Sequence, residues 1–443
     1  MLNKSIGGVG EAVGTEAAGA GNNRERESIM GSMAWKFDER ERKYIREVLD
    51  SGFVCGSSGS MNQRFERAFA EKIGRAHAVA CSNGTVSLHM ALWALGVGHG
   101  DEVLVTPLTV ISCMNAILYC NAIPVFTDID PETFLIDPAD IRRKITPRTK
   151  AIMAVNLYGA VCDMTEIMKI ADEFHLGVIE DCAQCYLGRH RGRVGGTFGH
   201  IGSWSLEASK HLSIGDGGIV ATDDEEFALR LRSFATQGFR NLTADSGRFR
   251  LPGNATPEQK KRALRDMFQS NTYKRHDRFG CNYRLPEVAA AVGLGQVEKI
   301  EHFVSLRQQS ARHYDAAIDG CKWIVPQHVV VPGDENSYFT YALRMTRDDV
   351  PWEDFRAKYI EFNHGGSVFA AWQLLYNEGS IPDIRERVFG PLGFNDRFVT
   401  DRGICPQAEL VQPQLMQFAT NQHEEEEMKR EADSLYRTIR YFE

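Results

Sequence analysis

The sequence predicts an α/β protein: a large lobe built on a mainly parallel seven-stranded sheet between helices, followed by a smaller α+β C-terminal domain. Between about residues 76 and 222, short runs of β-branched and apolar residues alternate with segments of helical periodicity. This alternation is typical of a parallel sheet wrapped by helices. After about residue 301 the pattern becomes mixed, with a strand-like run at 338–345 and a helical run at 352–361. The chain of 443 residues also exceeds what one small core needs, so more than one lobe is expected.

The strands of the large lobe are predicted from seven short apolar runs. We place them at residues 76–81, 102–106, 123–127, 150–156, 177–181, 201–205 and 218–222. Helices are expected between most of them. The helix that follows Asp163 is a clear case, because its first turn is acidic and apolar residues follow at helical spacing.

The chain divides into three predicted parts. Residues 1–33 have low hydrophobicity and no sustained period, so we expect a disordered tail. Residues 34–300 form the large lobe, with a basic insertion at about 241–280 that contains a helix at 257–268. We interpret the insertion as a solvated surface helix and loop, with a lid that meets substrate phosphates as the alternative. Residues 301–443 form the small domain, whose last helix opens at the acidic run 424–427.

Composition excludes several classes of protein. A net charge of −8 gives no general attraction to nucleic acid, and 43% hydrophobic with 25% charged residues is ordinary for a soluble protein. The apolar runs fall short of the roughly 18 residues that span a bilayer. Ten cysteines in a chain of this length, with no charged-then-apolar leader, favour reduced thiols. We therefore expect a cytoplasmic protein that binds neither nucleic acid nor membrane.

The segment Ser82-Asn83-Gly84-Thr85 lies where a predicted strand ends and a helix begins. A helix N-terminus offers free N–H groups and the positive end of the helix dipole. Gly84 and Thr85 are therefore candidates for holding a phosphate, although the same segment also suits a simple capped helix start.

Asp181 and Gln184 come at the end of the strand predicted at 177–181, where open α/β sheets bind their ligands. A carboxylate there needs a cationic partner, unless it only caps the next helix. Cys182 and Cys185 share this segment with a spacing that also suits a metal or a redox site. The other cysteines offer no second pair, so no metal site is predicted and the two thiols are expected to pack in the core.

Lys210 stands between the strand that ends at Ser205 and the glycine-rich turn 215–218. A lysine placed there can lie beside a buried cofactor, where desolvation makes its amine nucleophilic. A surface lysine in a loop is the alternative. The segment Asn282-Tyr283-Arg284, which precedes an apolar helix, says little by itself.

Taken together and in this order, these motifs resemble those of the DegT/DnrJ/EryC1/StrS family of sugar aminotransferases, which depend on pyridoxal 5′-phosphate (PLP) and have the aspartate-aminotransferase-like fold type I. The resemblance covers roughly residues 51–300, with a looser match to the C-terminus. It rests on Gly84-Thr85, Asp181-x-x-Gln184, Ser205, Lys210, Gly215-Asp216-Gly217-Gly218 and Asn282-Tyr283-Arg284.

The resemblance implies that the large lobe is the PLP-binding catalytic domain. Lys210 would be the Schiff-base lysine and the catalytic residue. Asp181 would pair with the pyridine nitrogen, and Gln184 would lie near the ring hydroxyl.

The resemblance also implies how the phosphate is held. Gly84, Thr85 and Ser205 would bind it within one subunit. Asn282 would reach the phosphate of the neighbouring subunit, which implies a homodimer with shared active sites. Arg284 would brace that loop or meet substrate.

Two positions depart from the pattern of the family. The relatives commonly place an aromatic residue over the cofactor ring where this chain has Val110, which makes the stacking aliphatic. They also commonly have a histidine where this chain has Asn156, ahead of Leu157-Tyr158-Gly159.

The implied activity is transfer of an amino group from glutamate or glutamine to a ketone. The acceptor would be a nucleotide-linked or phosphorylated keto sugar, or a keto cyclitol, in amino-sugar or secondary-metabolite biosynthesis. One alternative is a deoxysugar dehydratase of the same family, in which histidine replaces the lysine. His211 is adjacent, but the spacing to Gly215 assigns that place to Lys210. The other alternative is a non-catalytic regulator that keeps the fold.

Overall fold

The computed structural model describes residues 33–56, 59–247, 256–364 and 368–443. The tail expected at 1–33 lies outside these residues except for Met33. No described helix is both long and apolar enough to cross a bilayer.

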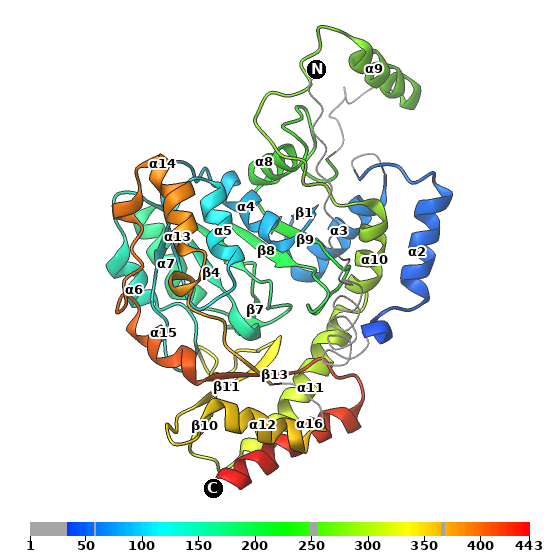
Figure 1. Cartoon of the computed structure of the whole chain (residues 1–443). Helices are drawn as coiled ribbons and strands as arrows, with labels where there is room; N and C mark the ends of the chain where they lie inside the picture. The colour runs from blue at the N-terminus through cyan, green and yellow to red at the C-terminus, as the bar shows by residue number, and fades with distance from the viewer. Residues whose placement is uncertain (1–32, 57–58, 248–255, 365–367) are drawn as a thin grey trace, which may run out of the picture.

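The large lobe is built on a seven-stranded sheet (Figure 1). Only β9 runs antiparallel to its neighbours in this sheet, so the predicted mainly parallel sheet is confirmed. Each of the seven strands lies within one residue of its predicted bounds. In spatial order the strands are β1 (His77–Cys81), β9 (Gly218–Thr222), β8 (Ile201–Ser205), β5 (Gly177–Asp181), β4 (Thr149–Val155), β2 (Glu102–Val105) and β3 (Ile123–Phe126).

Helices pack around this sheet (Figure 1). Among them, α10 packs against both α2 and α3. The helix α9 occupies the predicted insertion and stands away from the sheet in Figure 1. The helices of the large lobe are α2 (Glu39–Asp50), α3 (Met61–Ile73), α4 (Gly84–Ala94), α5 (Ser112–Tyr119), α6 (Pro138–Lys144), α7 (Met164–Phe174), α8 (Glu225–Ala235), α9 (Pro257–Gln269) and α10 (Glu287–Val297).

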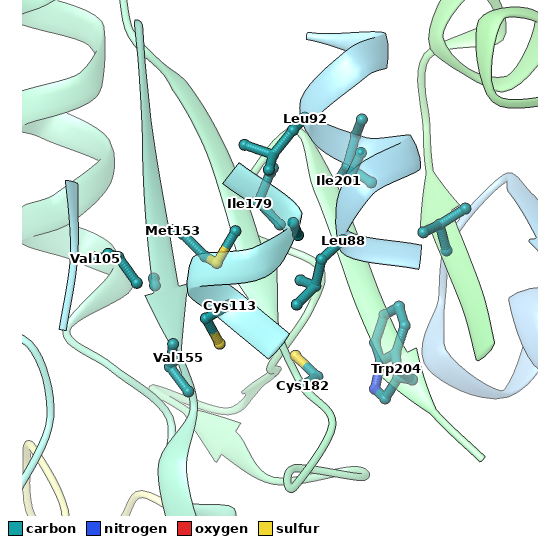
Figure 2. Close-up of a cluster of buried hydrophobic side chains, with 14 of the residues drawn as sticks. Leu88, Leu92, Val105, Cys113, Met153, Val155, Ile179, Cys182, Ile201 and Trp204 are labelled. Atoms are coloured by element: carbon teal, nitrogen blue, oxygen red, sulfur yellow. The ribbon is translucent and has the colours of Figure 1, made fainter. Parts of the chain in front are cut away.

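The helix α4 is the central helix of the lobe. Its sequence is apolar on nearly every side, and eight of its 11 residues are buried, which is the pattern of a helix enclosed by other elements. Leu88 and Leu92 point toward the sheet beside Ile179 and Ile201, and Trp204 extends the same cluster (Figure 2). This packing fixes the N-terminus of α4 against the ends of β5 and β8.

The small domain has a four-stranded antiparallel sheet with its own apolar core. Its strands, in order, are β10 (Ile324–Pro326), β11 (Thr340–Met345), β13 (Leu415–Ala419) and β12 (Val368–Ala370). Its helices are α11 (Ile300–Ile318), α12 (Trp352–Phe362) and α16 (Glu425–Phe442). The acidic run therefore opens the final helix, as its sequence indicated. A two-stranded ribbon of β6 (Arg189–His190) and β7 (Arg193–Val194) completes the strands.

A segment between β12 and β13 returns to the large lobe. It contains α13 (Ile381–Ile384), α14 (Gly390–Leu392) and α15 (Pro406–Val411), and these helices lie beside α5, α6 and α7 in Figure 1. The Asp128 carboxylate accepts the N–H groups of Gln407 and Ala408 at 2.9 and 2.8 Å. Lys144 donates to the carbonyl of Ile404 at 2.9 Å. Three hydrogen bonds thus attach this segment to the large lobe.

The carboxylate of Glu180 stabilises the strand that carries the site. It is fully buried and accepts the N–H groups of Gly196, Phe198 and Gly199 at 2.7, 2.6 and 2.7 Å. The loop after β7 is therefore fixed to the end of β5, one residue before Asp181.

We expect Glu180→Ala to lower the free energy of unfolding by about 3 kcal/mol, because it leaves three buried N–H groups without an acceptor. Urea denaturation followed by circular dichroism measures the change. Glu166→Ala is the matched control, since that side chain is exposed on α7, and it should change the free energy by less than about 0.5 kcal/mol. Equal effects of the two substitutions would contradict this role of Glu180.

Candidate active site

Gly84 and Ser205 meet at the edge of the sheet where α4 begins. A Cβ atom added to Gly84 would lie 2.7 Å from Ser205 Cβ and 2.9 Å from Ser205 Oγ. A side chain at position 84 would therefore displace Ser205. Only glycine fits at position 84, because the backbone there approaches Ser205 closely. The backbone of α4 and the Ser205 hydroxyl can therefore face the same space.

The first turn of α4 presents backbone N–H groups that have no acceptor within the helix. The side chain of Asn83 caps the helix by accepting the Val86 N–H at 2.9 Å. In a helix, the N–H groups of the first positions have no intrahelical acceptor, which applies to Gly84 and Thr85. The Thr85 hydroxyl donates to Ser112 Oγ at 2.9 Å. The site thus combines amide and hydroxyl donors at a helix N-terminus, as a phosphate requires.

Asp181 is the last residue of β5 and is almost fully buried. Its Oδ1 accepts the Ala183 N–H at 2.9 Å, and its Oδ2 accepts the Cys113 thiol at 3.2 Å. Burial raises the pKa of Asp181, while these two donors and the charge of Lys210 act in the opposite direction. Burial also raises the pKa of Cys113 well above its ordinary value, so its thiol stays protonated and can donate. A cation placed before this carboxylate would hold it ionised.

Gln184 is oriented by the backbone next to it. Its Oε1 accepts the Tyr158 N–H at 2.8 Å. Tyr158 lies in the 3-10 turn Leu157–Gly159 and has a φ of 61°. Because the amide oxygen is used in this contact, the amide NH₂ is the group of Gln184 that remains suited to donate to a ligand.

Asn156 and the two neighbouring cysteines belong to the core. Asn156 Nδ2 donates to Cys182 Sγ at 3.2 Å, and its Oδ1 accepts the Cys162 N–H at 2.9 Å. Cys185 donates to the Gly159 carbonyl at 3.3 Å. Burial raises the pKa of Cys185 to about 12 and that of Cys182 well above its ordinary range. Both are protonated packing thiols, and Figure 2 shows Cys182 within the apolar cluster.

Lys210 is half-buried, and its side chain reaches the small domain. Its Nζ lies 4.3 Å from the ring centroid of Phe339, a residue of the small domain. Burial lowers the pKa of Lys210, and the charge of Arg307 lowers it further, whereas Glu207 and Asp181 raise it. An amine with a lowered pKa is more often neutral near pH 7 and is a better nucleophile.

Two further predicted residues, Val110 and Asn282, lie at the edge of this group of side chains. Val110 is partly buried against the large core just before α5. Asn282 has an exposed side chain, and its backbone bridges to Thr236. The neighbouring Tyr283 carbonyl accepts the Ser82 N–H at 3.0 Å, which places this segment beside the turn at residues 82–85.

Three residues of the site were not identified from the sequence. Ser112 and Cys113 follow the loop after β2, and their polar run could have indicated them. Phe339 comes from the small domain, and no motif connects it to Lys210.

A two-lobed α/β fold with a half-buried amine, a buried carboxylate and a glycine at a helix N-terminus is typical of an enzyme of the aminotransferase class. The profile of the DegT/DnrJ/EryC1/StrS aminotransferase family matches residues 36–368. The chain belongs to this family, as the resemblance of its motifs predicted.

Relatives and solved structures agree with this assignment. The GDP-perosamine synthase of Caulobacter vibrioides is 34% identical over 322 residues, which cover 71% of this chain and 78% of that protein. The L-glutamine:2-deoxy-scyllo-inosose aminotransferase of Micromonospora echinospora is 38% identical over 312 residues, or 69% of each chain. The X-ray structure of an aminotransferase from Psychrobacter cryohalolentis has a TM-score of 0.74 and 28% identity, covering 90% of this chain and 96% of that one.

The lowered pKa of Lys210 makes stability depend on pH. In the cofactor-free protein, the folded state holds this proton less tightly than the unfolded chain, whose lysine titrates near 10.5. Stability is therefore lost as pH falls from 10.5 toward the lower folded pKa, at about 1.4 kcal/mol per pH unit for one group.

We expect Lys210→Met to reduce the rise in unfolding free energy that the protein shows between about pH 8 and pH 10. Urea denaturation of cofactor-free protein at the two pH values measures it. Lys150→Met, at an exposed position of β4, is the control and should keep the rise of the unchanged protein. An undiminished rise in Lys210→Met would show that the amine is not desolvated.

Proposed function

We propose that this aminotransferase uses PLP, and that it moves an amino group from glutamate or glutamine to the ketone of a sugar or cyclitol. The observation that carries the proposal is the placement of the half-buried Lys210 amine where its charge acts on the buried Asp181 carboxylate, in the same lobe as the close approach of Gly84 and Ser205. The acceptor class is supported by relatives named as a GDP-perosamine synthase and as a 2-deoxy-scyllo-inosose aminotransferase.

The residues present fit PLP. A buried carboxylate with a raised pKa suits a protonated ring nitrogen, and neutral donors at a helix N-terminus suit a phosphate dianion. The residues that would hold the cofactor are Gly84, Thr85 and Ser205 at the phosphate, Asp181 at the ring nitrogen, Gln184 at the ring hydroxyl, Val110 at the ring face and Lys210 at the reactive carbon.

When bound, PLP supplies a carbon that can carry the amino group and a ring that draws electrons from the substrate carbon. Lys210 is the group that exchanges places with the incoming amine. Once free, its amine can take a proton from the donor carbon and return one to the acceptor carbon. Asp181 balances the positive charge at the ring nitrogen throughout.

The net change moves one amino group between two carbons. The donor CH–NH₂ becomes a ketone, and the acceptor ketone becomes CH–NH₂. Donor and acceptor use Lys210 in turn, so the proposal requires ping-pong kinetics.

The dehydratase alternative is not favoured by the geometry of His211. This side chain is fully buried, and its Nε2–H donates to the Ser337 carbonyl at 2.9 Å. Burial lowers the pKa of His211 well below its ordinary value. Its ring packs beside Tyr186, with centroids 5.1 Å apart. His211 thus joins the two lobes, and Lys210 is left as the reacting group.

We further propose a homodimer acting in the cytoplasm, with active sites shared between subunits. The exposed side chain of Asn282 supports this assembly, because its segment lies beside the phosphate-binding turn yet points the amide to solvent. A second subunit that received Asn282 would complete its phosphate site.

We expect Lys210→Ala to fold normally and to lose turnover by at least about 10³-fold, because no other group can exchange with the amine. The visible absorption spectrum with PLP tests the chemistry directly. The unchanged protein should show the band of lysine-bound cofactor and lose it when glutamate or glutamine is added, whereas Lys210→Ala should show no such band. Near-normal transamination by Lys210→Ala would refute the proposed mechanism.

We expect Gly84→Ala to weaken PLP binding at least about tenfold, because the added methyl group displaces Ser205 from the phosphate site. Titration of cofactor-free protein with PLP, followed by absorbance, gives the dissociation constant. Gly98→Ala is the matched control, since a Cβ there meets no atom within 4 Å. Unchanged affinity in Gly84→Ala would remove this residue from the site.

A further inference from the structure

Lys36 is a buried lysine that contacts the backbone of Lys210. It ends the 3-10 turn Met33–Lys36 and is only 2% exposed. Its Nζ donates to the Lys210 carbonyl at 2.8 Å. Lysines are rarely buried to this degree without a charged partner, so this placement calls for a reason.

The charged groups that act on Lys36 belong to the active-site region. Burial and the charge of Arg307 lower the pKa of Lys36 to about 7, and Glu207 acts in the opposite direction. Apolar rings surround the amine: Trp35 and Phe303 have their centroids 5.9 and 5.8 Å away.

The backbone of Lys36 is itself fixed to the large lobe. Its carbonyl accepts from Gln296 Nε2 at 2.8 Å and from Lys299 Nζ at 2.7 Å. Glu41 on α2 receives the same two donors, at 2.9 and 2.7 Å. Lys36 therefore reaches Lys210 from an anchored segment.

Arg307 on α11 holds the peptide group between Ser209 and Lys210. It is almost fully buried and donates to the Ser209 carbonyl at 3.1 Å and to the Phe339 carbonyl at 2.6 Å. The Phe339 ring is the one beneath the Lys210 amine. The carbonyls of Ser209 and Lys210 are thus each held by a buried basic side chain, one from each lobe.

Burying the basic side chains of Lys36 and Arg307 costs free energy, because both groups lose their hydration. Apolar side chains of similar volume would fill the same space at a lower cost. Resting on the proposed function, we propose that Lys36 is a positioning residue for Lys210. By fixing the carbonyl of Lys210, it sets the direction in which that side chain leaves the backbone. A misplacement of about 1 Å at a reacting group can cost about 100-fold in rate.

The test uses the full chain with PLP bound and three variants. Lys36→Met keeps the length and the apolar contacts but removes the donor, and Lys36→Arg restores a donor. Lys144→Met is the matched control. Like Lys36, Lys144 donates to the backbone, but in another part of the lobe: its Nζ contacts the Phe126 carbonyl at 2.6 Å and the Ile404 carbonyl at 2.9 Å. Stopped-flow absorbance follows the loss of the lysine-bound cofactor band after glutamate or glutamine is added, and thermal unfolding is measured in parallel.

We expect the maximal rate of this half-reaction to fall about 10- to 100-fold in Lys36→Met. The half-saturating donor concentration should change less than about threefold and the Tm less than about 3 °C. Lys36→Arg should recover most of the rate, and Lys144→Met should retain it. Lys36→Gln, whose amide falls short of the Lys210 carbonyl, gives the same comparison if the methionine variant folds poorly.

An unchanged rate in Lys36→Met and Lys36→Gln would overturn the positioning role while leaving the proposed function intact. The positioning role is equally overturned if the rate falls only together with Tm and Lys36→Arg does not recover it, because that pattern belongs to a structural lysine. Absence of the band from the unchanged protein would instead overturn the proposed function on which the inference rests.

Discussion

The desolvation that the half-buried Lys210 amine and the buried Asp181 carboxyl share is the constraint on which the rest of the structure depends. Removal from water pushes both groups toward their neutral forms, lowering the pKa of the amine and raising that of the carboxyl. Such groups persist in a core only where donors and polarisable partners surround them. The partners here are the Cys113 thiol, the Ala183 N–H and the Phe339 ring. They come from α5, the end of β5 and the small domain, so the site exists only when these three parts are together.

This requirement explains how the two lobes are joined. The sheet and α4 of the large lobe provide the phosphate cradle and the carboxylate, whereas the small domain provides the ring beneath the amine and, through His211, the Ser337 carbonyl. A lobe that moved freely would expose the amine and restore its ordinary pKa. The segment that carries α13 to α15 packs on the large lobe, and the Asp128 carboxylate holds it there. This attachment limits movement between the lobes. The Asp128 and His211 contacts thus hold the parts of the site together as well as the fold.

Much of this arrangement could be predicted from the sequence, and the reasons for success and failure are physical. Strands of a parallel sheet buried on both faces are continuous apolar runs bounded by turn residues, which is why all seven bounds were close. The order of the motifs at Gly84, Asp181 and Lys210 indicated the family, and each of them follows or ends a strand of the large sheet. Phe339, Arg307 and Lys36 could not be predicted, because each is far from Lys210 in the sequence and no local pattern connects them. The short helices of residues 381–411 were missed because they have too few turns to show a period.

This chain departs from the family pattern at two positions, Val110 and Asn156. Where relatives commonly place an aromatic residue over the ring, Val110 offers a smaller aliphatic contact, and Asn156 has both polar ends engaged in the core. Neither side chain is aromatic, so neither provides a ring face at its position. The backbone around Lys210 is well fixed, because the carbonyls of Lys210 and Ser209 accept from two buried basic side chains, Lys36 and Arg307. The contacts of this region therefore fix the lysine segment through its backbone.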